Sequence, residues 1–389
     1  MPRGRADCHN GHMPAVEGEG ARRVLVTGLS TYWGGKLAHA LESNPEIEAI
    51  IGVDSMEPTR ELERTEYVKV GAQHGLIEKI VRAARIDTVV DTRLVVDSSR
   101  KPTGSVPESI HENNVIGTLN ILAACSAADS PVKRLVFKSS AHWYGCAQDD
   151  PAFFTEGMNR MHPPGTAIER DLVEAEAAVD DFRKRRPEVT VSVLRFANVL
   201  GAEVNTSHVK LFSLPMVPII AGFDPRYQFV DEVDVVHALE HVTIRDLPGV
   251  FNVAGDGVLT LTETISLLGK HPLPVIPPWG TGLATSVMRK FGMTLTDEML
   301  AQLRFGRGMD NRLFKSTGFH YRYTSRETVV HLRERLRLGP VVSGVSNPYR
   351  YEPEVEEFLR HSPHVIREPS KDVGREDAAM FDPSPPVEE

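Results

Sequence analysis

The clearest chemistry in this chain lies in a glycine-containing turn after an apolar run. The segment Val24–Gly35 reads Val-Leu-Val-Thr-Gly-Leu-Ser-Thr-Tyr-Trp-Gly-Gly, which is typical of a strand, a turn and a helix start. A helix start presents free N–H groups and a positive dipole end, and glycines let the backbone approach closely, so the segment suits a pyrophosphate. The required glycine spacing falls on Gly28, position 31 and Gly34, but position 31 is Thr31.

An acidic residue follows at the place where a dinucleotide site needs one. Asp54 ends the next apolar run, 26 positions after Gly28. A carboxylate there bonds ribose hydroxyls and repels a 2′-phosphate, which favours NAD over NADP. The alternative is a strand–turn–helix that binds nothing.

The elements that must position these residues alternate between strand and helix. We predict strands at 23–27, 47–54, 88–90, 134–139 and 189–195, and helices at 35–43, 76–84, 111–127 and 166–185. Alternation of this kind indicates a parallel sheet covered on both faces. The predicted fold class is therefore α/β, a doubly wound sheet of the NAD(P)-binding Rossmann type, with a smaller C-terminal substrate lobe.

Composition divides the chain into four parts. Residues 1–20 lack periodicity and are expected to form a disordered leader. Residues 21–200 carry the alternating pattern of the dinucleotide-binding domain. Prolines break residues 201–339 into short pieces, which favours a substrate-binding lobe whose strands return to the sheet. Residues 340–389 are polar and proline-rich, as in a flexible tail.

The totals exclude several function classes. The 389 residues carry a net charge of −9, which argues against general binding to nucleic acid or to anionic membranes. No apolar run approaches the ~20 residues that span a bilayer, so we expect a cytoplasmic protein without a membrane span. The three cysteines show no paired spacing, which indicates a reducing compartment. Cys8, His9 and His12 are a weak ligand set, and no metal is predicted.

Several further segments, in order along residues 22–330, resemble the extended short-chain dehydrogenase/reductase family, in its NAD-dependent epimerase/dehydratase group. They are Asn114-Val-Ile-Gly-Thr-Leu-Asn120, Val136-Phe-Lys-Ser-Ser-Ala-His-Trp-Tyr-Gly145, Leu194-Arg-Phe-Ala-Asn-Val-Leu-Gly201, Gln228-Phe-Val-Asp-Glu-Val-Asp234 and Val250-Phe-Asn-Val-Ala-Gly255. Several ordered motifs together are more specific than any one of them.

The resemblance implies NAD as cofactor, a nucleotide-linked sugar as substrate and roles for three residues. Ser140 would be the active-site hydroxyl, Asn198 would touch the substrate, and Asn114 would brace the helix beside the cofactor. The residues alone favour structural roles for both: Ser140 as a strand-end hydroxyl that caps a turn, and Asn198 as a turn former.

The sequence departs from the family where proton transfer takes place. Family members carry Tyr and Lys four positions apart on the long helix, and these positions match Thr166 and Arg170. A threonine hydroxyl does not titrate near neutral pH, whereas an assisted tyrosine acts as acid or base. Arg93 replaces a small residue that lines the cofactor, and would either pair with the pyrophosphate or fill the slot.

The substrate side departs as well. The arginine expected to hold the substrate phosphate falls on Tyr227, with Arg226 one residue early. A slip of one residue on a strand reverses the face, although a loop can absorb it. His142 or His162 could replace the missing base, since histidine titrates in the useful range.

Two hypotheses follow. The first is an enzyme of the epimerase/dehydratase type that acts on a UDP-hexose with a base other than tyrosine. The second is a catalytically inactive sensor or scaffold that binds NAD or a nucleotide sugar. The helix at 166–185 could form a homodimer contact, and the helical pattern at 277–311 favours a packing helix over a lid or a membrane-surface segment.

Overall fold

The computed structural model describes residues 22–70, 75–96, 110–275 and 297–344, the last six without side chains. The chain divides into two compact units between Leu338 and Gly339, and the elements that position the site belong to the first unit. The expected leader at 1–20 lies outside the described residues, as does nearly all of the expected tail at 340–389.

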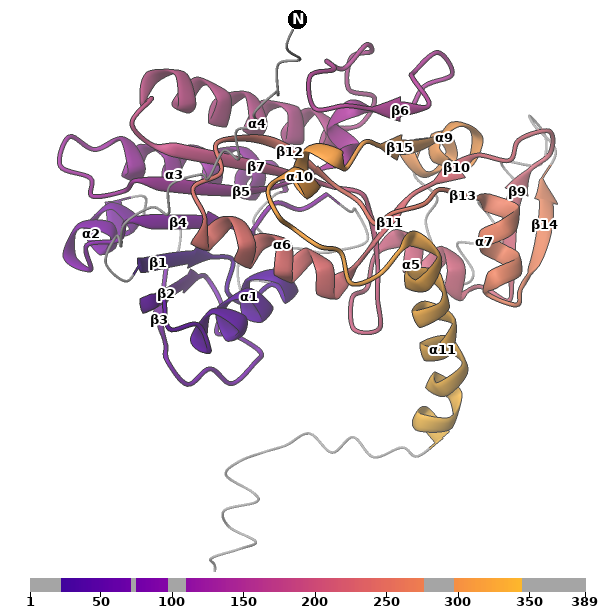
Figure 1. The fold of residues 1–389 in the computed structure, drawn as a ribbon, viewed down its shortest axis with the longest axis horizontal. Coiled ribbons are helices and arrows are strands. Elements are labelled where there is room, and N and C mark those ends of the chain that lie inside the picture. The colour runs from indigo at the N-terminus through magenta and orange to yellow at the C-terminus, as the bar shows by residue number, and fades with distance from the viewer. Residues whose placement is uncertain (1–21, 71–74, 97–109, 276–296, 345–389) are drawn as a thin grey trace, which may run out of the picture. The chain divides into compact units, whose positions relative to one another are not determined.

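A seven-stranded sheet forms the centre of the fold (Figure 1). Its strands follow the order β12-β7-β5-β4-β1-β2-β3, and every neighbouring pair is parallel. In chain order they are β1 (Arg22–Thr27), β2 (Ile47–Asp54), β3 (Thr65–Lys69), β4 (Thr88–Asp91), β5 (Arg134–Ser140), β7 (Thr190–Phe196) and β12 (Gly249–Val253).

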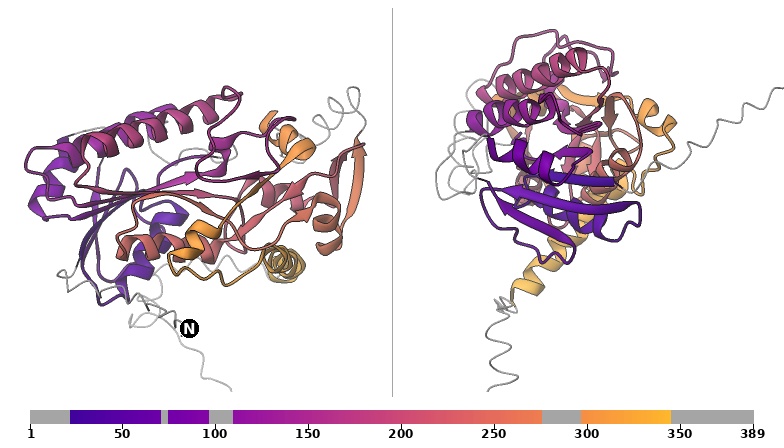
Figure 2. Two further views of the ribbon diagram at one scale, coloured as in Figure 1. Left: turned by 45° about the horizontal axis from the view of Figure 1, so that its top comes forward. Right: turned by 90° about the vertical axis from the view of Figure 1, so that its left-hand side faces the viewer.

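Helices cover both faces of this sheet (Figures 1 and 2). One face carries α2 (Gly75–Ala83), α3 (Gly117–Ser126) and α4 (Ala167–Arg185), and the other carries α1 (Tyr32–Glu42) and α6 (Glu232–Ile244). Because side chains alternate along a strand, Val24 and Val26 join the buried cluster on the α1 face, while Leu25 joins the cluster on the α3 face. This arrangement confirms the predicted doubly wound α/β fold.

The other elements extend the fold beyond the carboxyl ends of the strands. One group forms a four-stranded sheet in the order β13-β10-β15-β6, and two strand pairs, β11–β8 and β14–β9, complete the pairing. In chain order these elements are η1 (Glu112–Ile116), η2 (Ala141–Tyr144), β6 (Phe153–Phe154), β8 (Asn198–Leu200), α5 (Ser207–Ser213), β9 (Met216–Ile220), β10 (Arg226–Tyr227), β11 (Phe229–Asp231), β13 (Leu259–Thr260), α7 (Leu261–Leu267), β14 (His271–Val275), α9 (Asp297–Phe305), β15 (Gly306–Met309), α10 (Arg312–Ser316) and α11 (Ser325–Gly344).

The structure confirms the five predicted strands and the four predicted helices of the N-terminal half, with small shifts at their ends. The strands β3 and β12 were not predicted. The helical pattern at 277–311 holds only for α9, because Gly306–Met309 forms the strand β15, and residues 276–296 lie outside the described residues. Met299 and Leu303 of α9 are buried, as expected of a packing helix.

Candidate active site

The glycine turn after β1 has the close backbone packing that its sequence predicts. Gly28 has a φ of +80°, in the left-handed region that favours glycine. A Cβ on Gly34 would lie 2.1 Å from the carbonyl oxygen of Gly28, so only glycine fits where α1 crosses the end of β1. The α1 N-terminus is thereby held directly beyond the strand.

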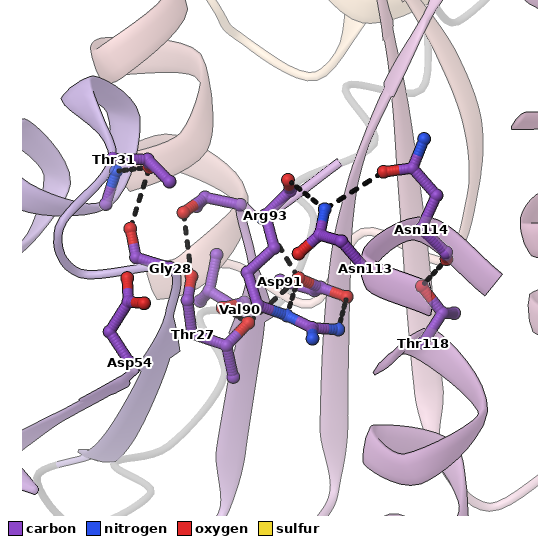
Figure 3. Close-up of polar contacts among 12 residues, drawn as sticks. Thr27, Gly28, Thr31, Asp54, Val90, Asp91, Arg93, Asn113, Asn114 and Thr118 are labelled. Carbon is purple, nitrogen blue, oxygen red and sulfur yellow. Dashed lines mark hydrogen bonds and ion pairs between the residues drawn. The ribbon is translucent and has the colours of Figure 1, made fainter. Parts of the chain in front are cut away.

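Thr31, at the position of the missing glycine, caps helix α1 (Figure 3). Its hydroxyl donates to the carbonyl oxygen of Gly28 at 2.7 Å and accepts from the backbone N–H of Gly34 at 3.1 Å. The Thr31 side chain thus fixes the turn with two hydrogen bonds, whereas a glycine at this position would leave the backbone more flexible. It also uses one of the N–H groups that a helix start otherwise offers to an anion.

Asp54 lies at the carboxyl end of β2, beside the glycine turn. Its Oδ2 accepts from the backbone N–H and the hydroxyl of Ser30 at 2.8 and 2.7 Å, and its Oδ1 accepts from the N–H of Ser55 at 2.7 Å. Because these partners are neutral, they orient the Asp54 carboxylate without balancing its negative charge. The position matches the one predicted for contact with a ribose.

Arg93, two residues beyond the end of β4, pairs with the carboxylate of Asp91, the last residue of that strand. Its Nε and Nη2 each lie 3.1 Å from an oxygen of Asp91, which is buried and also accepts from the hydroxyl of Thr27 at 2.8 Å. The guanidinium packs on Gly117, where a Cβ would lie 2.3 Å from Nη1. Figure 3 shows the side chain folded back toward Asp91 and not toward the helix start at Thr31.

Asn114 braces the start of the α3 region against the segment after β4. Its side chain is fully buried, accepts from the N–H of Val95 at 2.8 Å and donates to the carbonyl of Val95 at 2.8 Å. Asn113 adds a bond to the carbonyl of Arg93 at 3.0 Å. The segment that follows β4 is therefore fixed at the edge of the predicted cofactor site.

These residues fit a dinucleotide at the carboxyl edge of the sheet. The positive φ of Gly28, the collision that excludes a Cβ at Gly34, and the anchored Asp54 provide the features that such a ligand needs. Arg93 does not extend across the helix start, because its guanidinium is held by Asp91.

Ser140 and His142 lie at the carboxyl end of β5. The Ser140 hydroxyl accepts from the backbone N–H of His142 at 3.3 Å and so caps the short helix η2. The Nδ1 of His142 lies 3.0 Å from Oε1 of Glu298 on α9, and its Nε2 lies 3.3 Å from Nε2 of Gln302.

The tyrosine that follows them, Tyr144, is part of the core. It is fully buried, and its hydroxyl donates to Oδ1 of Asn252 at 2.8 Å. Burial raises the pKa of Tyr144, which disfavours a phenolate there. Tyr144 therefore has a structural role in the core.

Thr166 and Arg170, at the positions of the family tyrosine and lysine, lie one helical turn from each other, and the backbone N–H of Arg170 donates to the carbonyl oxygen of Thr166 at 3.1 Å. Thr166 is the N-cap of α4 and accepts from the N–H of Glu169 at 3.2 Å. Arg170 is exposed to solvent. The structure therefore gives Thr166 no cationic partner from one turn along the helix.

A cavity of about 250 Å³ is lined by two of the four catalytic candidates, His142 and Thr166, whereas Ser140 and Arg170 are not part of its lining. Among the described residues, its lining comprises Val96, His142, Thr166, Ala167, Ile168, Ser207, His208, Glu298, Met299 and Gln302. It brings His142 next to the tyrosine position, Thr166. Sequence reasoning missed Glu298 and Gln302; their spacing of four on a helix places them on one face, but nothing local relates that face to His142.

The predicted substrate residues lie outside this lining. Asn198 is mostly buried on β8, in register with Phe229, and Arg226 is exposed on β10. Tyr227 points inward, as the reversed face predicts, and is fully buried. In the parallel pairing of β10 with β15, the partner of Tyr227 is Arg307, a buried arginine whose Nη1 donates to the carbonyl of Gly145 at 2.8 Å.

His162, the second candidate base, is also outside the lining. Its Nε2 lies 2.8 Å from Oδ1 of Asp149, and its side chain is partly exposed.

Two further searches cover the same described part of the chain. No helix there is long and apolar enough to cross a membrane. No group of three or more metal-ligating His, Cys, Asp or Glu side chains occurs there, and Cys8, His9 and His12 lie outside it.

Comparison with known proteins identifies the family. Residues 24–254 match the model of the NAD dependent epimerase/dehydratase family. An uncharacterized protein of Mycobacterium tuberculosis is 34% identical over 325 residues, which cover 82% of this chain and 85% of that protein. UDP-glucose 4-epimerase 3 of Oryza sativa subsp. japonica is 30% identical over 132 residues, 32% of each chain.

Solved structures share the fold. The UDP-glucuronic acid 4-epimerase of Bacillus cereus, in complex with UDP-glucuronic acid and NAD, gives a TM-score of 0.61 at 15% identity, over 81% of this chain and 99% of that one. The dTDP-glucose 4,6-dehydratase of Bacillus anthracis, in complex with NAD, gives 0.60 at 19% identity, over 82% and 98%. The chain belongs to the NAD dependent epimerase/dehydratase family.

Proposed function

We propose that this protein binds NAD and acts on a nucleotide-linked sugar, as an epimerase or dehydratase whose proton-transfer residue is not tyrosine. The observation that carries the proposal is the cavity in which an ionisable side chain, His142, and the residue at the tyrosine position, Thr166, line the same space. Relatives named as UDP-glucose 4-epimerases, and fold neighbours solved with NAD and UDP-sugars, support this substrate class.

The cofactor residues support the first half of the proposal. Backbone N–H groups at the start of α1 would meet the pyrophosphate, and Asp54 would accept from the adenosine ribose and disfavour a 2′-phosphate. Bound NAD⁺ would accept a hydride from a carbon of the sugar. Compared with glycine, Thr31 adds a β-carbon with a methyl and a hydroxyl group at the start of α1, where the pyrophosphate would approach the backbone.

The substrate side supports the second half. Ser140 is the last residue of β5, and Asn198 follows the carboxyl end of β7 by two residues, as the first residue of β8. Ligands of open α/β sheets bind beyond the carboxyl ends of the strands. Arg226 is exposed and would reach a substrate phosphate only from outside the lining. Arg307 is a buried arginine that pairs in register with Tyr227, the position at which the family resemblance places the substrate arginine.

Native mass spectrometry of the isolated protein, together with assays on a panel of UDP- and dTDP-hexoses, tests the proposal. We expect copurified or added NAD at one equivalent per chain and turnover of at least one sugar. The mass also reports the subunit number, which tests the proposed homodimer. If the folded protein binds neither NAD nor a nucleotide sugar, the proposal is wrong.

A second candidate function is a binding module without turnover. The Arg93–Asp91 pair and the capping role of Thr166 favour it, because a position that lines the cofactor in the family and the position of the family tyrosine both serve structure here. Binding of NAD with no conversion of any sugar in the panel would support this alternative over the enzyme.

A further inference from the structure

Two elements that are distant in the chain bring a carboxylate to the imidazole in the cavity. His142 comes from η2, directly after β5, and Glu298 comes from the first turn of α9. The Nδ1 of His142 lies 3.0 Å from Oε1 of Glu298, and both side chains are mostly buried, at 16% and 12% exposure. We propose that His142 and Glu298 form the proton-transfer pair of this site, with Gln302 as a positioning residue; this inference rests on the proposed function.

The position of Gln302 sets the tautomer of the imidazole. Its Nε2 lies 3.3 Å from Oε1 of Glu298 and 3.3 Å from Nε2 of His142. An amide NH₂ facing a carboxylate is favourable, whereas an amide oxygen there would be repelled. We therefore assign the His142 proton to Nδ1, the nitrogen that lies at ion-pair distance from Glu298, and the lone pair to Nε2.

Gln302 also indicates that a ligand belongs in the cavity. The side chain is 99% buried, since only 1% is exposed, yet its Oε1 has no hydrogen-bond partner among the described residues. A buried amide oxygen without a partner is costly. A sugar hydroxyl that donates to Oε1 would satisfy it and would lie within reach of the imidazole.

The chemistry of the pair is that of a carboxylate-oriented general base. A sugar hydroxyl that replaces the contact with Gln302 would give its proton to Nε2 of His142 as the carbon–oxygen double bond forms. Bound NAD⁺, held by the start of α1 and by Asp54, would supply the oxidant that takes the hydrogen of that carbon with its electron pair. Glu298 would stabilise the resulting imidazolium, and Nε2 would return the proton when the carbonyl is reduced.

The other polar groups around the imidazole have different duties. The Nη1 of Arg160 donates to the carbonyl oxygen of His142 at 3.1 Å, while its Nη2 is bound by Glu169. His208 lies on the cavity wall, and Thr166 is fixed as a helix cap. His142 and Glu298 are therefore the pair in which a base and its orienting carboxylate face the same space.

Substitution of each member, with the His331–Asp231 pair as matched control, tests the proposal; in that pair Nδ1 of a 42% exposed histidine lies 3.2 Å from a carboxylate oxygen, and neither residue lines the cavity. We expect His142→Gln to lower kcat by about 10²–10⁴-fold and Glu298→Gln by about 10–10²-fold, with NAD affinity unchanged within twofold. The double variant should fall no further than His142→Gln, because the two residues act as a unit. His331→Gln should retain the parent rate.

An NMR titration supplies a readout that does not depend on turnover. In the full-length protein, the ¹⁵N shifts of His142 should report the Nδ1–H tautomer, and Glu298→Gln should lower the imidazole pKa, because it removes a neighbouring negative charge. A higher kcat for Glu298→Asp than for Glu298→Gln would show that the carboxylate charge is required, and not only a side chain of similar size.

The outcomes distinguish this inference from the proposed function. If the parent protein converts a sugar and His142→Gln converts it at the same rate, the pair is wrong and the proposed function stands. If the parent protein converts no sugar, both are wrong. An Nε2–H tautomer, or an imidazole pKa that Glu298→Gln does not move, would contradict the assigned pairing.

Discussion

Both oxygens of the buried Asp91 carboxylate hold the guanidinium of Arg93, at 3.1 Å each, in the layer between β4 and α3. Two glycines make room for that side chain: a Cβ on Gly28 would lie 2.7 Å from its Cγ, and a Cβ on Gly117 would lie 2.3 Å from its Nη1. The arginine is therefore part of the scaffold beneath the cofactor site, and its charge is balanced before any phosphate arrives.

This packing predicts a large effect of a single methyl group. Gly117→Ala should destabilise the protein by about 1–3 kcal/mol in urea denaturation, because the new Cβ displaces a buried ion pair. Gly75→Ala is the matched control: it also lies at a helix start, but a Cβ there meets nothing within 4 Å, so stability should not fall. In an Arg93→Ala background, Gly117→Ala should no longer lower the free energy of unfolding. An unchanged decrease would mean that another contact is responsible.

Restoring glycine at the cap of α1 should separate stability from cofactor binding. Thr31→Gly removes two hydrogen bonds and should lower stability by a few tenths to about 1 kcal/mol. It also releases the N–H of Gly34 and should tighten NAD binding in calorimetry. Thr260→Gly removes the equivalent cap of α7 and should leave NAD affinity unchanged. Equal affinity for NAD in Thr31→Gly and the parent would show that Thr31 does not restrict the cofactor.

Asp54 should set the preference between the two nicotinamide cofactors. Asp54→Asn removes the negative charge, so NAD should bind more weakly and its advantage over NADP should shrink by about tenfold or more. Asp224→Asn is a close control. Asp224 also accepts from a backbone N–H and a hydroxyl, both of Thr262, and it is not one of the residues of the cofactor site. Titration with both cofactors measures the ratio, and a ratio that Asp54→Asn leaves intact would contradict the assigned contact.

Acid should destabilise the fold through His241, a partly buried histidine on α6. Burial lowers the pKa of His241 to about 4, and its ring packs on Phe314 and Phe319. The unfolded chain binds the proton more readily, so the stability contributed by neutral His241 is complete above pH 6.5 and is lost as the pH falls toward 4. Between pH 6.5 and pH 4, the free energy of unfolding measured from denaturation curves should fall less for His241→Phe than for the parent protein.

Two comparisons control this experiment. Burial raises the pKa of Asp234 to about 6, which favours the protonated native state and acts in the opposite direction in the same range. The slope must therefore be compared between variant and parent. His39→Gln alters a histidine whose side chain is 58% exposed and should leave the parent slope unchanged. If the free energy of unfolding of His241→Phe depends on pH with the same slope as that of the parent, His241 is not the source of the acid destabilisation.

The sequence predicts the cofactor side better than the catalytic side, for a physical reason. Gly28, Gly34 and Asp54 belong to one strand–turn–helix–strand unit, whose geometry follows from local residue types. His142 and Glu298 meet only through the packing of α9, and no local pattern relates them. For Thr166 a local signal did exist: a threonine followed three residues later by Glu169 is typical of a helix N-cap.

That cap predicts what restoring the family residues will do. In the double variant Thr166→Tyr/Arg170→Lys, the new lysine would replace an exposed side chain, and the tyrosine would replace the hydroxyl that accepts from the N–H of Glu169. We expect stability to fall by about 1 kcal/mol, as in Thr166→Ala, because the cap is lost. We expect no increase in turnover, since the start of α4 does not direct position 170 toward the cavity. Assay of the double variant on the sugars that the parent converts measures this; a gain of tenfold or more would show that α4 can still present the pair, and that the His142–Glu298 pair is not required.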